Sequence, residues 1–372
     1  MITDILRYFL LKKPDSAQIS RILRKENFIY TQEDIENLLR GNQKGVRYGN
    51  AVLVRNESNL QVRRFFKVML DGTLRTFRLF RRQIEISNAL NKDEKFDSPT
   101  IEVLKYSLNS PVPYGIFETR ENGDNFGFMH DNPTFYEKFT EQDMQNLVSS
   151  IYSFHNAGLE MDSKIWKYTQ NIPSDFYHYK KQIKKYLDQK IKHKSVDGKV
   201  TENRVIELIE TYTGLQKIDA IVEDVLEKNW KQVISSKIKN KKFLVHADMQ
   251  IDNIYKHKDG TFELIDFEWV GGSDNPVIAI MYDYGNLRAR AWSSPTFQEM
   301  LDKNMLEIGK TYYQDNNIIK AGLILGMLRS SIMMAHFHMD FANTVKKDKR
   351  TEQDYQNMYP RTLTTIKQVL RG

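Results

Sequence analysis

The segment KFLVHADMQIDNIYKHKDGTFELIDFEWVGGSDNP, residues 242–276, decides the fold of this chain. Short apolar runs alternate in it with Asp, Asn and Gly, a texture that indicates a loop-rich β segment. The sequence on either side of it is mostly helical in pattern. Because polar side chains gather at the loops between its apolar strands, this segment is where we look for chemistry.

Four polar residues of the segment stand in the spacing HxDxxxxN followed by LIDFE. His246, Asp248 and Asn253 supply the first motif, and Asp266 supplies the second. A short loop can present Asp248 as a carboxylate that receives the proton of an attacking hydroxyl. A β-hairpin would bring Asn253 and Asp266 together as the hard oxygen ligands that Mg²⁺ requires. Each residue alone has an ordinary explanation in a turn or at a strand end, so the joint spacing is the signal.

These two motifs, HADMQIDN and IDFE, resemble the catalytic and metal-binding motifs of the aminoglycoside phosphotransferase and choline kinase superfamily. The resemblance implies an α+β, bilobal protein-kinase-like fold with a small β-rich N-lobe and a large helical C-lobe. It implies that Asp248 is the catalytic base and that His246 orders the catalytic loop. It also implies that Asn253 and Asp266 bind Mg²⁺. One departure is visible, because Ala247 stands where a glycine commonly follows the histidine.

A kinase-like N-lobe also needs a strand lysine for the α and β phosphates of the nucleotide, and a helix carboxylate that fixes this lysine. Lys67 in RRFFKVML and Glu85 in RRQIEISNAL meet these requirements. An ion pair between them would hold the flexible amine over the phosphates. Two alternatives stay open: Lys67 as an ordinary edge-strand lysine, and Glu85 paired with Arg81 or Arg82 on its own helix.

Two further stretches resemble parts of a nucleotide site. YGIFETRENG looks like the strand and hinge whose backbone binds the adenine edge, with Glu118, Thr119 and Arg120 nearest to the nucleotide. GNQKGVRYGN, residues 41–50, stands where a phosphate-covering loop would be, although by itself it reads as an ordinary turn.

The neighbourhood of the motifs holds further candidates. DNPVIAIMYDYGNL resembles the segment that follows the metal-binding aspartate in this superfamily, which implies that Asp283 tethers the catalytic loop through hydrogen bonds. Glu268 lies two residues after Asp266, so alternation along a local strand would place both on one side, where Glu268 contacts substrate or a second metal, or points into solvent. Phe154 and His155 end a helix, and we expect both to pack in the core.

Changes in the pattern of apolar and polar residues divide the whole chain into three regions. Residues 1–40 read as a helical N-terminal extension, in which Thr31 followed by Asp34 resembles a helix start. Residues 41–120 are the expected nucleotide-binding N-lobe. Residues 121–372 are the expected catalytic and substrate-binding C-lobe, with a helical insert at about 161–239.

Within these regions, period-two and period-3.6 patterns predict individual elements. Thr140 is placed to cap a helix over 140–157. In the N-lobe the strands expected are 50–54, 62–70, 100–106 and 114–119, and the helix expected is 77–90.

Length and composition exclude several classes of protein. With 372 residues, 40% of them hydrophobic, the chain can bury substantial cores, which excludes a stapled mini-protein and a disordered chain. The absence of cysteine removes disulfides, thiolate zinc sites and cysteine nucleophiles. The longest apolar run, residues 321–328, is far too short to span a bilayer, so we expect a cytoplasmic protein with no membrane partner.

We therefore expect a small-molecule kinase, an enzyme that moves the γ-phosphoryl group of ATP, or GTP, to a hydroxyl with the help of Mg²⁺. The expected partners are the nucleoside triphosphate and a small hydroxylated acceptor such as a sugar, an amino alcohol or an aminoglycoside-like molecule. The chain is basic, at +7, so a sugar or amino alcohol is favoured over a polycationic antibiotic.

Three alternatives remain. A protein kinase would share the core, but no clear DFG or APE motif is present. A catalytically silent nucleotide-binding module would keep the fold without the reaction. A nucleic-acid-binding protein would explain the positive charge and the lysine-rich stretch around Lys180 to Lys194, although we do not expect nucleic acid as a partner.

Overall fold

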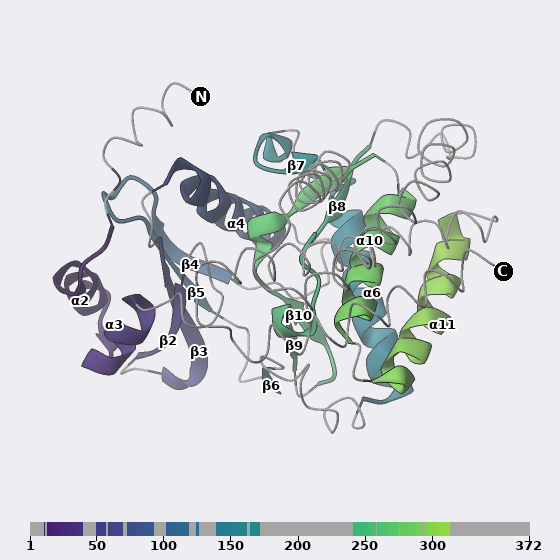
Figure 1. The fold of residues 1–372 in the computed structure, drawn as a ribbon, viewed down its shortest axis with the longest axis horizontal. Coiled ribbons are helices and arrows are strands. Elements are labelled where there is room, and N and C mark those ends of the chain that lie inside the picture. Colours follow the sequence, from purple (N-terminus) through teal and green to yellow (C-terminus); the bar gives the residue numbers. More distant parts are fainter. Residues whose placement is uncertain are drawn as a thin grey trace, which may run out of the picture. The chain divides into compact units, whose positions relative to one another are not determined.

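The computed structural model describes most of the predicted N-lobe and the motif-bearing segment (Figure 1). The described residues are 11, 13–39, 50–56, 59–69, 73–92, 102–118, 124–125, 139–161, 164–171, 241–257, 259–274, 276–291 and 294–312. The chain forms two compact units. The first comprises Met1–Phe126, Ser149–Thr169 and Asp252–Val270, and the second comprises Gly127–Val148, Gln170–Ile251 and Gly271–Gly372.

A five-stranded antiparallel sheet is the framework of the first unit, with the order β1-β2-β3-β5-β4. All four strands predicted from the sequence are present. The strands are β1 (Phe28–Ile29), β2 (Asn50–Asn56), β3 (Asn59–Val68), β4 (Glu102–Ser107) and β5 (Tyr114–Glu118). The unpredicted strand, β1, pairs with β2 and extends the sheet at that edge.

Two helices precede and follow β1, and each begins with a reciprocal cap. Asp15 Oδ1 accepts a hydrogen bond from the backbone N–H of Gln18 at 2.7 Å, at the start of α2 (Ser16–Lys25). Before α3 (Gln32–Leu39), Thr31 and Asp34 exchange bonds of 2.7 and 3.1 Å. These side chains satisfy backbone donors that a helix N-terminus leaves unpaired, and the helix start predicted at Thr31 is confirmed.

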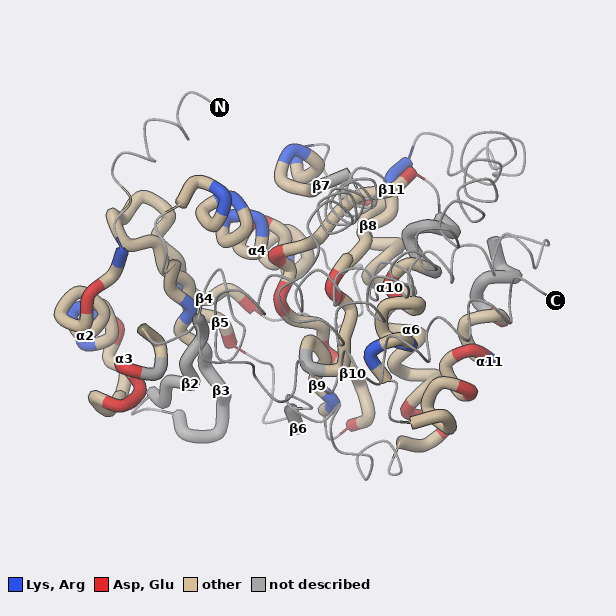
Figure 2. The backbone as a smooth tube through the Cα atoms, viewed as in Figure 1, with Lys and Arg blue, Asp and Glu red and all other residues tan. Residues whose placement is uncertain are grey.

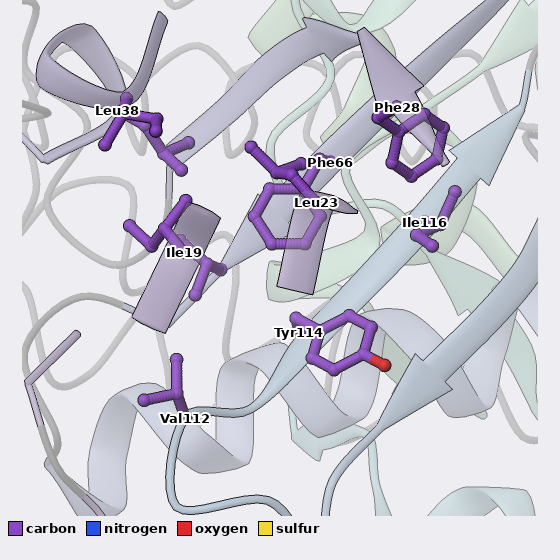
Figure 3. Close-up of a cluster of buried hydrophobic side chains, with 10 residues drawn as sticks. Ile19, Leu23, Phe28, Leu38, Phe66, Val112, Tyr114 and Ile116 are labelled. Atoms are coloured by element: carbon purple, nitrogen blue, oxygen red, sulfur yellow. The ribbon is translucent and has the colours of Figure 1, made fainter. Parts of the chain in front are cut away.

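These helices cover one face of the sheet and bury its apolar residues (Figure 3). Ile19 and Leu23 of α2 and Leu38 of α3 are at most 1% exposed. They belong to one cluster with Phe66 of β3 and Ile116 of β5, which are directly opposite each other in the ladder and therefore lie on the same face of the sheet. The N-terminal helices are therefore part of the core of this unit.

The opposite face of the sheet carries Lys67, the strand neighbour of Phe66, and is covered by α4 (Leu74–Lys92). This helix contains the predicted run 77–90 and buries Phe77, Phe80 and Ile84. Figure 2 shows basic residues gathered along α4, where the side chains of Arg75 and Arg78 are exposed. The helix is thus amphipathic, with its apolar stripe against the sheet.

A second, smaller sheet of the first unit includes the hairpin between Asn253 and Asp266, the two predicted metal ligands. Its strands are β6 (Asp124–Asn125), β9 (Ile254–Lys256) and β10 (Phe262–Leu264), in the order β10-β9-β6. Strands β9 and β10 form the predicted hairpin, with Ile254 opposite Leu264. The chain then turns into a short 3₁₀ helix, η5 (Phe267–Trp269).

The second unit holds the segment that contains His246. A three-stranded sheet has the order β7-β11-β8, with β7 (Gln170–Asn171), β8 (Phe243–Val245) and β11 (Gly271–Ser273). Helix α10 (Pro276–Arg290) packs against β8 and against α11 (Pro295–Tyr312). Helix α6 (Glu141–Ala157) passes from the second unit into the first. It starts at Thr140, whose side chain accepts from the Asp143 backbone as predicted.

Several predicted features lie outside the described residues. The expected phosphate-covering loop before Asn50 and most of the expected insert, residues 172–239, belong to this group. Within the described part of the chain, no helix combines the length and apolar character needed to cross a membrane.

Candidate functional site

Lys67 is the centre of a buried charged cluster in the first unit. Its ammonium donates to Oε1 of Gln83 at 2.8 Å and to Oδ1 of Asp266 at 2.9 Å, and it lies 2.5 Å from Oε1 of Glu268. The lysine comes from β3, the amide from α4, and the two carboxylates from the segment after β10. The structure thus brings together Lys67 and Asp266, two predicted site residues that are 199 positions apart in the sequence.

Burial and charge act in opposite directions on this lysine. Removing the ammonium from water favours its neutral form, but the attraction of Asp266 and Glu268 is larger in total and raises the pKa of Lys67 above its ordinary value. The lysine is therefore charged throughout the physiological range. A permanently charged, immobilised ammonium suits the binding of phosphate oxygens.

The predicted ion pair between Lys67 and Glu85 is wrong. Glu85 instead pairs with Arg81, four residues earlier on the same helix, at 3.5 Å, which is one of the alternatives left open above. The reason is helix geometry. Residues two positions apart on an α-helix point about 200° apart, so when Gln83 faces Lys67, Glu85 faces away from it.

The place of Glu268 also differs from the sequence prediction. We expected a local strand after Asp266, with Glu268 exposed or turned toward substrate. The chain forms the 3₁₀ helix η5 there, and Glu268 is 6% exposed with its carboxylate on Lys67. Alternation along a strand therefore did not apply, and Glu268 supplies the counterion expected from Glu85.

Helix α4 also holds the backbone of η5. Arg82 donates from one terminal nitrogen to the carbonyl oxygen of Glu268 at 2.7 Å and from Nε to the carbonyl oxygen of Tyr168 at 2.5 Å. Phe267 of η5 stacks on Phe154 of α6, with ring centroids 5.5 Å apart and planes 7° from parallel. Phe154 and His155 are both fully buried, as predicted. These contacts fix the segment that carries both carboxylates.

Asn253 and Asp266 are joined by the β9–β10 hairpin. The backbone N–H of Ile265 donates to the carbonyl oxygen of Asn253 at 3.0 Å, directly beside the residue pair Ile254 and Leu264. This places the two predicted metal ligands at the same end of the hairpin. An amide oxygen and a carboxylate are a donor set that fits Mg²⁺, which commonly fills its other positions with water and phosphate oxygens.

The loop with the HxD motif is tethered in the second unit by Asp283. One carboxylate of α10 accepts both neighbouring backbone N–H groups, from His246 at 2.6 Å and from Ala247 at 2.8 Å. Asp283 is fully buried. The predicted tether is confirmed, and Asn286, one turn later, adds a bond of 2.9 Å to the carbonyl oxygen of Met249 that the sequence analysis did not anticipate.

The backbone is unusual at both motifs. Ala247 has φ 63° and Asp266 has φ 65° and ψ 61°, and in the described part of the chain the other non-glycine residue with positive φ is Asn27. Left-handed backbone is costly for an L-residue with a Cβ, and such strain concentrates at functional sites. It also explains why glycine is common at the position of Ala247.

The remaining predicted residues are placed as follows. Asp248 is half-buried, and its Oδ2 accepts from the side chain of Gln250 at 3.4 Å. His246 is fully buried. Glu118 ends β5 and is half-buried, whereas Thr119 and Arg120 lie outside the described residues. Asp248 and His246 belong to the second unit, and Lys67, Asn253 and Asp266 to the first.

Comparisons at the level of sequence give no relative for this chain. No family model matches it, and no curated protein matches it. Similar folds are found by comparison of structures instead.

Three structural neighbours bear the names of an ethanolamine kinase, a choline kinase and an aminoglycoside phosphotransferase. Plasmodium vivax ethanolamine kinase matches with a TM-score of 0.54 and 12% identity over 94% of this chain and 95% of its own. Choline kinase LicA from Streptococcus pneumoniae gives 0.52 and 13% over 94% and 97%. An aminoglycoside phosphotransferase from Alicyclobacillus acidocaldarius gives 0.52 and 12% over 92% and 97%. At these identities the similarity is one of fold, and the chain has the fold of the aminoglycoside phosphotransferase and choline kinase superfamily.

Proposed function

We propose that this protein transfers the γ-phosphoryl group of ATP to a hydroxyl group of a small molecule. The observation that carries the proposal is the ion pair between Lys67 and Asp266. It unites the strand lysine and the IDFE aspartate in one buried cluster. The shared fold with choline kinase, ethanolamine kinase and an aminoglycoside phosphotransferase supports the same reaction type.

Each residue has a role that follows from its chemistry. Lys67 orients the phosphates as a fixed positive charge. Asn253 and Asp266 supply oxygen ligands for Mg²⁺, which when bound neutralises phosphate charge. Asp248 aligns the acceptor hydroxyl and takes its proton, and Asp283 keeps the loop that carries Asp248 in one conformation.

The reaction is tested first with a panel of acceptors. The purified chain is incubated with magnesium and ATP, and with GTP in parallel, together with choline, ethanolamine, simple sugars and aminoglycosides. Release of ADP or GDP and the mass of the phosphorylated product are recorded. Acceptor-dependent product with a mass gain of one phosphoryl group is expected. Binding of neither nucleotide in the presence of magnesium would refute the proposal.

The proposed roles of Asp248 and Asp266 can be told apart by how a substitution at each position changes turnover and ATP binding. Asp248→Ala should reduce turnover by about 100-fold or more while leaving magnesium-dependent ATP affinity nearly unchanged. Asp266→Ala should abolish the magnesium-dependent part of ATP binding as well. Asp259→Ala is a matched control, because Asp259 is exposed at the β9–β10 turn and bonds to Thr261. An Asp248→Ala protein with normal turnover would remove the base assignment.

A further inference from the structure

We propose that Glu268 is the residue that positions Lys67, in place of a carboxylate on α4. This inference rests on the proposed function, because it concerns how the same lysine is held for a nucleotide. It begins from the three groups around the ammonium, which are Gln83, Asp266 and Glu268. The amide is neutral, so the choice of counterion lies between the two carboxylates.

Exposure separates the two carboxylates. The side chain of Asp266 is 34% exposed, whereas those of Glu268 and Lys67 are 7% and 10% exposed. Asp266 can therefore be reached from solvent, and its oxygens are the ones needed as metal ligands. Glu268 is enclosed with the lysine. The accessible partner suits exchange with an incoming ligand, and the enclosed partner stays on Lys67.

The surroundings of Glu268 fix it in this position. Arg82 of α4 binds its carbonyl oxygen at 2.7 Å, and the preceding Phe267 stacks on Phe154. Helix α4 thus acts on the lysine in two ways: Gln83 contacts it directly, and Arg82 holds the turn that presents Glu268. Helix α4 therefore still positions Lys67, but the negative charge comes from η5 and not from the helix.

A neutral residue at position 83 is what the charge of the cluster requires. Lys67 already faces two carboxylates, so the charges of these three side chains sum to minus one. A third carboxylate there would be a buried charge without a partner, which is strongly unfavourable. Glutamine satisfies one N–H of the ammonium without adding charge.

The experiment moves the carboxylate from η5 to α4. Glu268→Gln, Gln83→Glu and the double variant are compared with wild type for magnesium-dependent binding of a fluorescent ATP analogue. Glu268→Gln should weaken binding by about tenfold or more, because Lys67 then depends on Asp266 alone. The double variant should recover most of this loss, since the glutamate introduced at position 83 would supply the missing charge from the helix. Glu33→Gln, an exposed change in α3, is the control.

Two outcomes would overturn the inference. If Glu268 is only structural, or is itself a metal ligand, the double variant will bind as poorly as Glu268→Gln. If the counterion is Glu85 after all, Glu85→Gln will weaken nucleotide binding and Glu268→Gln will leave it unchanged.

Thermal unfolding without any ligand tests this inference independently of the proposed function. Lys67→Met, Glu268→Gln and their combination are melted without any ligand. A buried pair should show strong coupling. The melting temperature of the double variant should then fall by less than the sum of the decreases in the two single variants. Additive losses would refute the pairing. Wild type that binds no nucleotide would refute the proposed function while leaving this measurement valid.

Discussion

Ala247 is a strained residue in the loop of the HxD motif. Its φ of 63° is left-handed, and the two bonds to Asp283 around it hold the loop in that conformation. The carboxylate of Asp283 therefore offsets the backbone strain that the Cβ of Ala247 causes and that a glycine would not have.

Ala247→Gly should stabilise the protein by about 0.5–1 kcal/mol, because relief of left-handed strain exceeds the entropy that glycine adds to the unfolded chain. The measurement is the free energy of unfolding in urea. Ala289→Gly serves as the matched control in helix α10, where glycine should destabilise by about 1 kcal/mol. A destabilised Ala247→Gly protein would show that the loop does not hold this angle in solution.

The residues of the candidate site were only partly predictable from the sequence. Lys67 and Asp266 were identified because a strand context and motif spacing select them without knowledge of packing. Asp283 was identified because its segment resembles the corresponding segment of the superfamily. Gln83 was missed, since the residue that faces Lys67 depends on how α4 is rotated on the sheet. Glu268 was named as a candidate but given another role, since the 3₁₀ helix η5 was expected to be a strand. The one available signal was the Arg81–Glu85 spacing, which already offered Glu85 a partner on its own helix.

At the scale of elements, the β9–β10 hairpin links the two predicted metal ligands and contains a buried pair of its own. His257 Nε2 lies 3.0 Å from Glu263 Oε2, and their side chains are 3% and 0% exposed. Glu263 is opposite Tyr255 in the ladder. His257 and Glu263 form an ion pair when His257 is protonated, and because both are buried, we expect the hairpin that carries Asn253 and Asp266 to be sensitive to the loss of either one.

Glu263→Ala should destabilise the protein by about 3 kcal/mol or more, because it removes one partner of a buried pair and leaves a cavity. Replacing both His257 and Glu263 with leucine should lose less than the single change. Urea unfolding measures both. Glu141→Gln, which removes an exposed pair with Lys303, should leave the unfolding midpoint almost unchanged. Equal effects of the buried and exposed changes would contradict the burial of the pair.

Elements differ in how well the sequence predicts them. Strands β2, β3, β4 and β5 and helix α4 have clear periodicity and were found within a few residues. Strand β1 has two residues, too few for any period, and it exists because β2 offers an open edge. The 3₁₀ helix η5 replaced an expected strand because the left-handed Asp266 turns the chain there.

At the scale of the molecule, the first unit is built from segments far apart in the chain. Residues before 40 cover the sheet, and residues after 250 complete the lysine cluster. The sequence shows where the textures change, but it does not show that the N-terminal helices share a core with β3 and β5. That core depends on long-range contacts, which no local pattern encodes.

Deletion of residues 1–39 should prevent stable folding of the first unit. It removes five buried apolar side chains, each contributing about 2 kcal/mol, so the loss is comparable to the total stability of a domain. The residues are Ile19, Leu23, Phe28, Ile35 and Leu38. Soluble yield and cooperativity of melting report the result. Leu23→Ala should lower stability by about 2–5 kcal/mol, whereas Arg21→Ala, exposed on the same helix, should not. A truncated chain that melts like the full one would refute the shared core.

The role of α2 and α3 in the core has a practical consequence for anyone who trims this gene by its recognisable motifs. A boundary drawn just ahead of the first glycine, Gly41, would discard part of the hydrophobic interior together with what looks like a dispensable leader. Misfolding of the resulting protein would then be attributed to residues of the candidate site, although its cause is the missing part of the core.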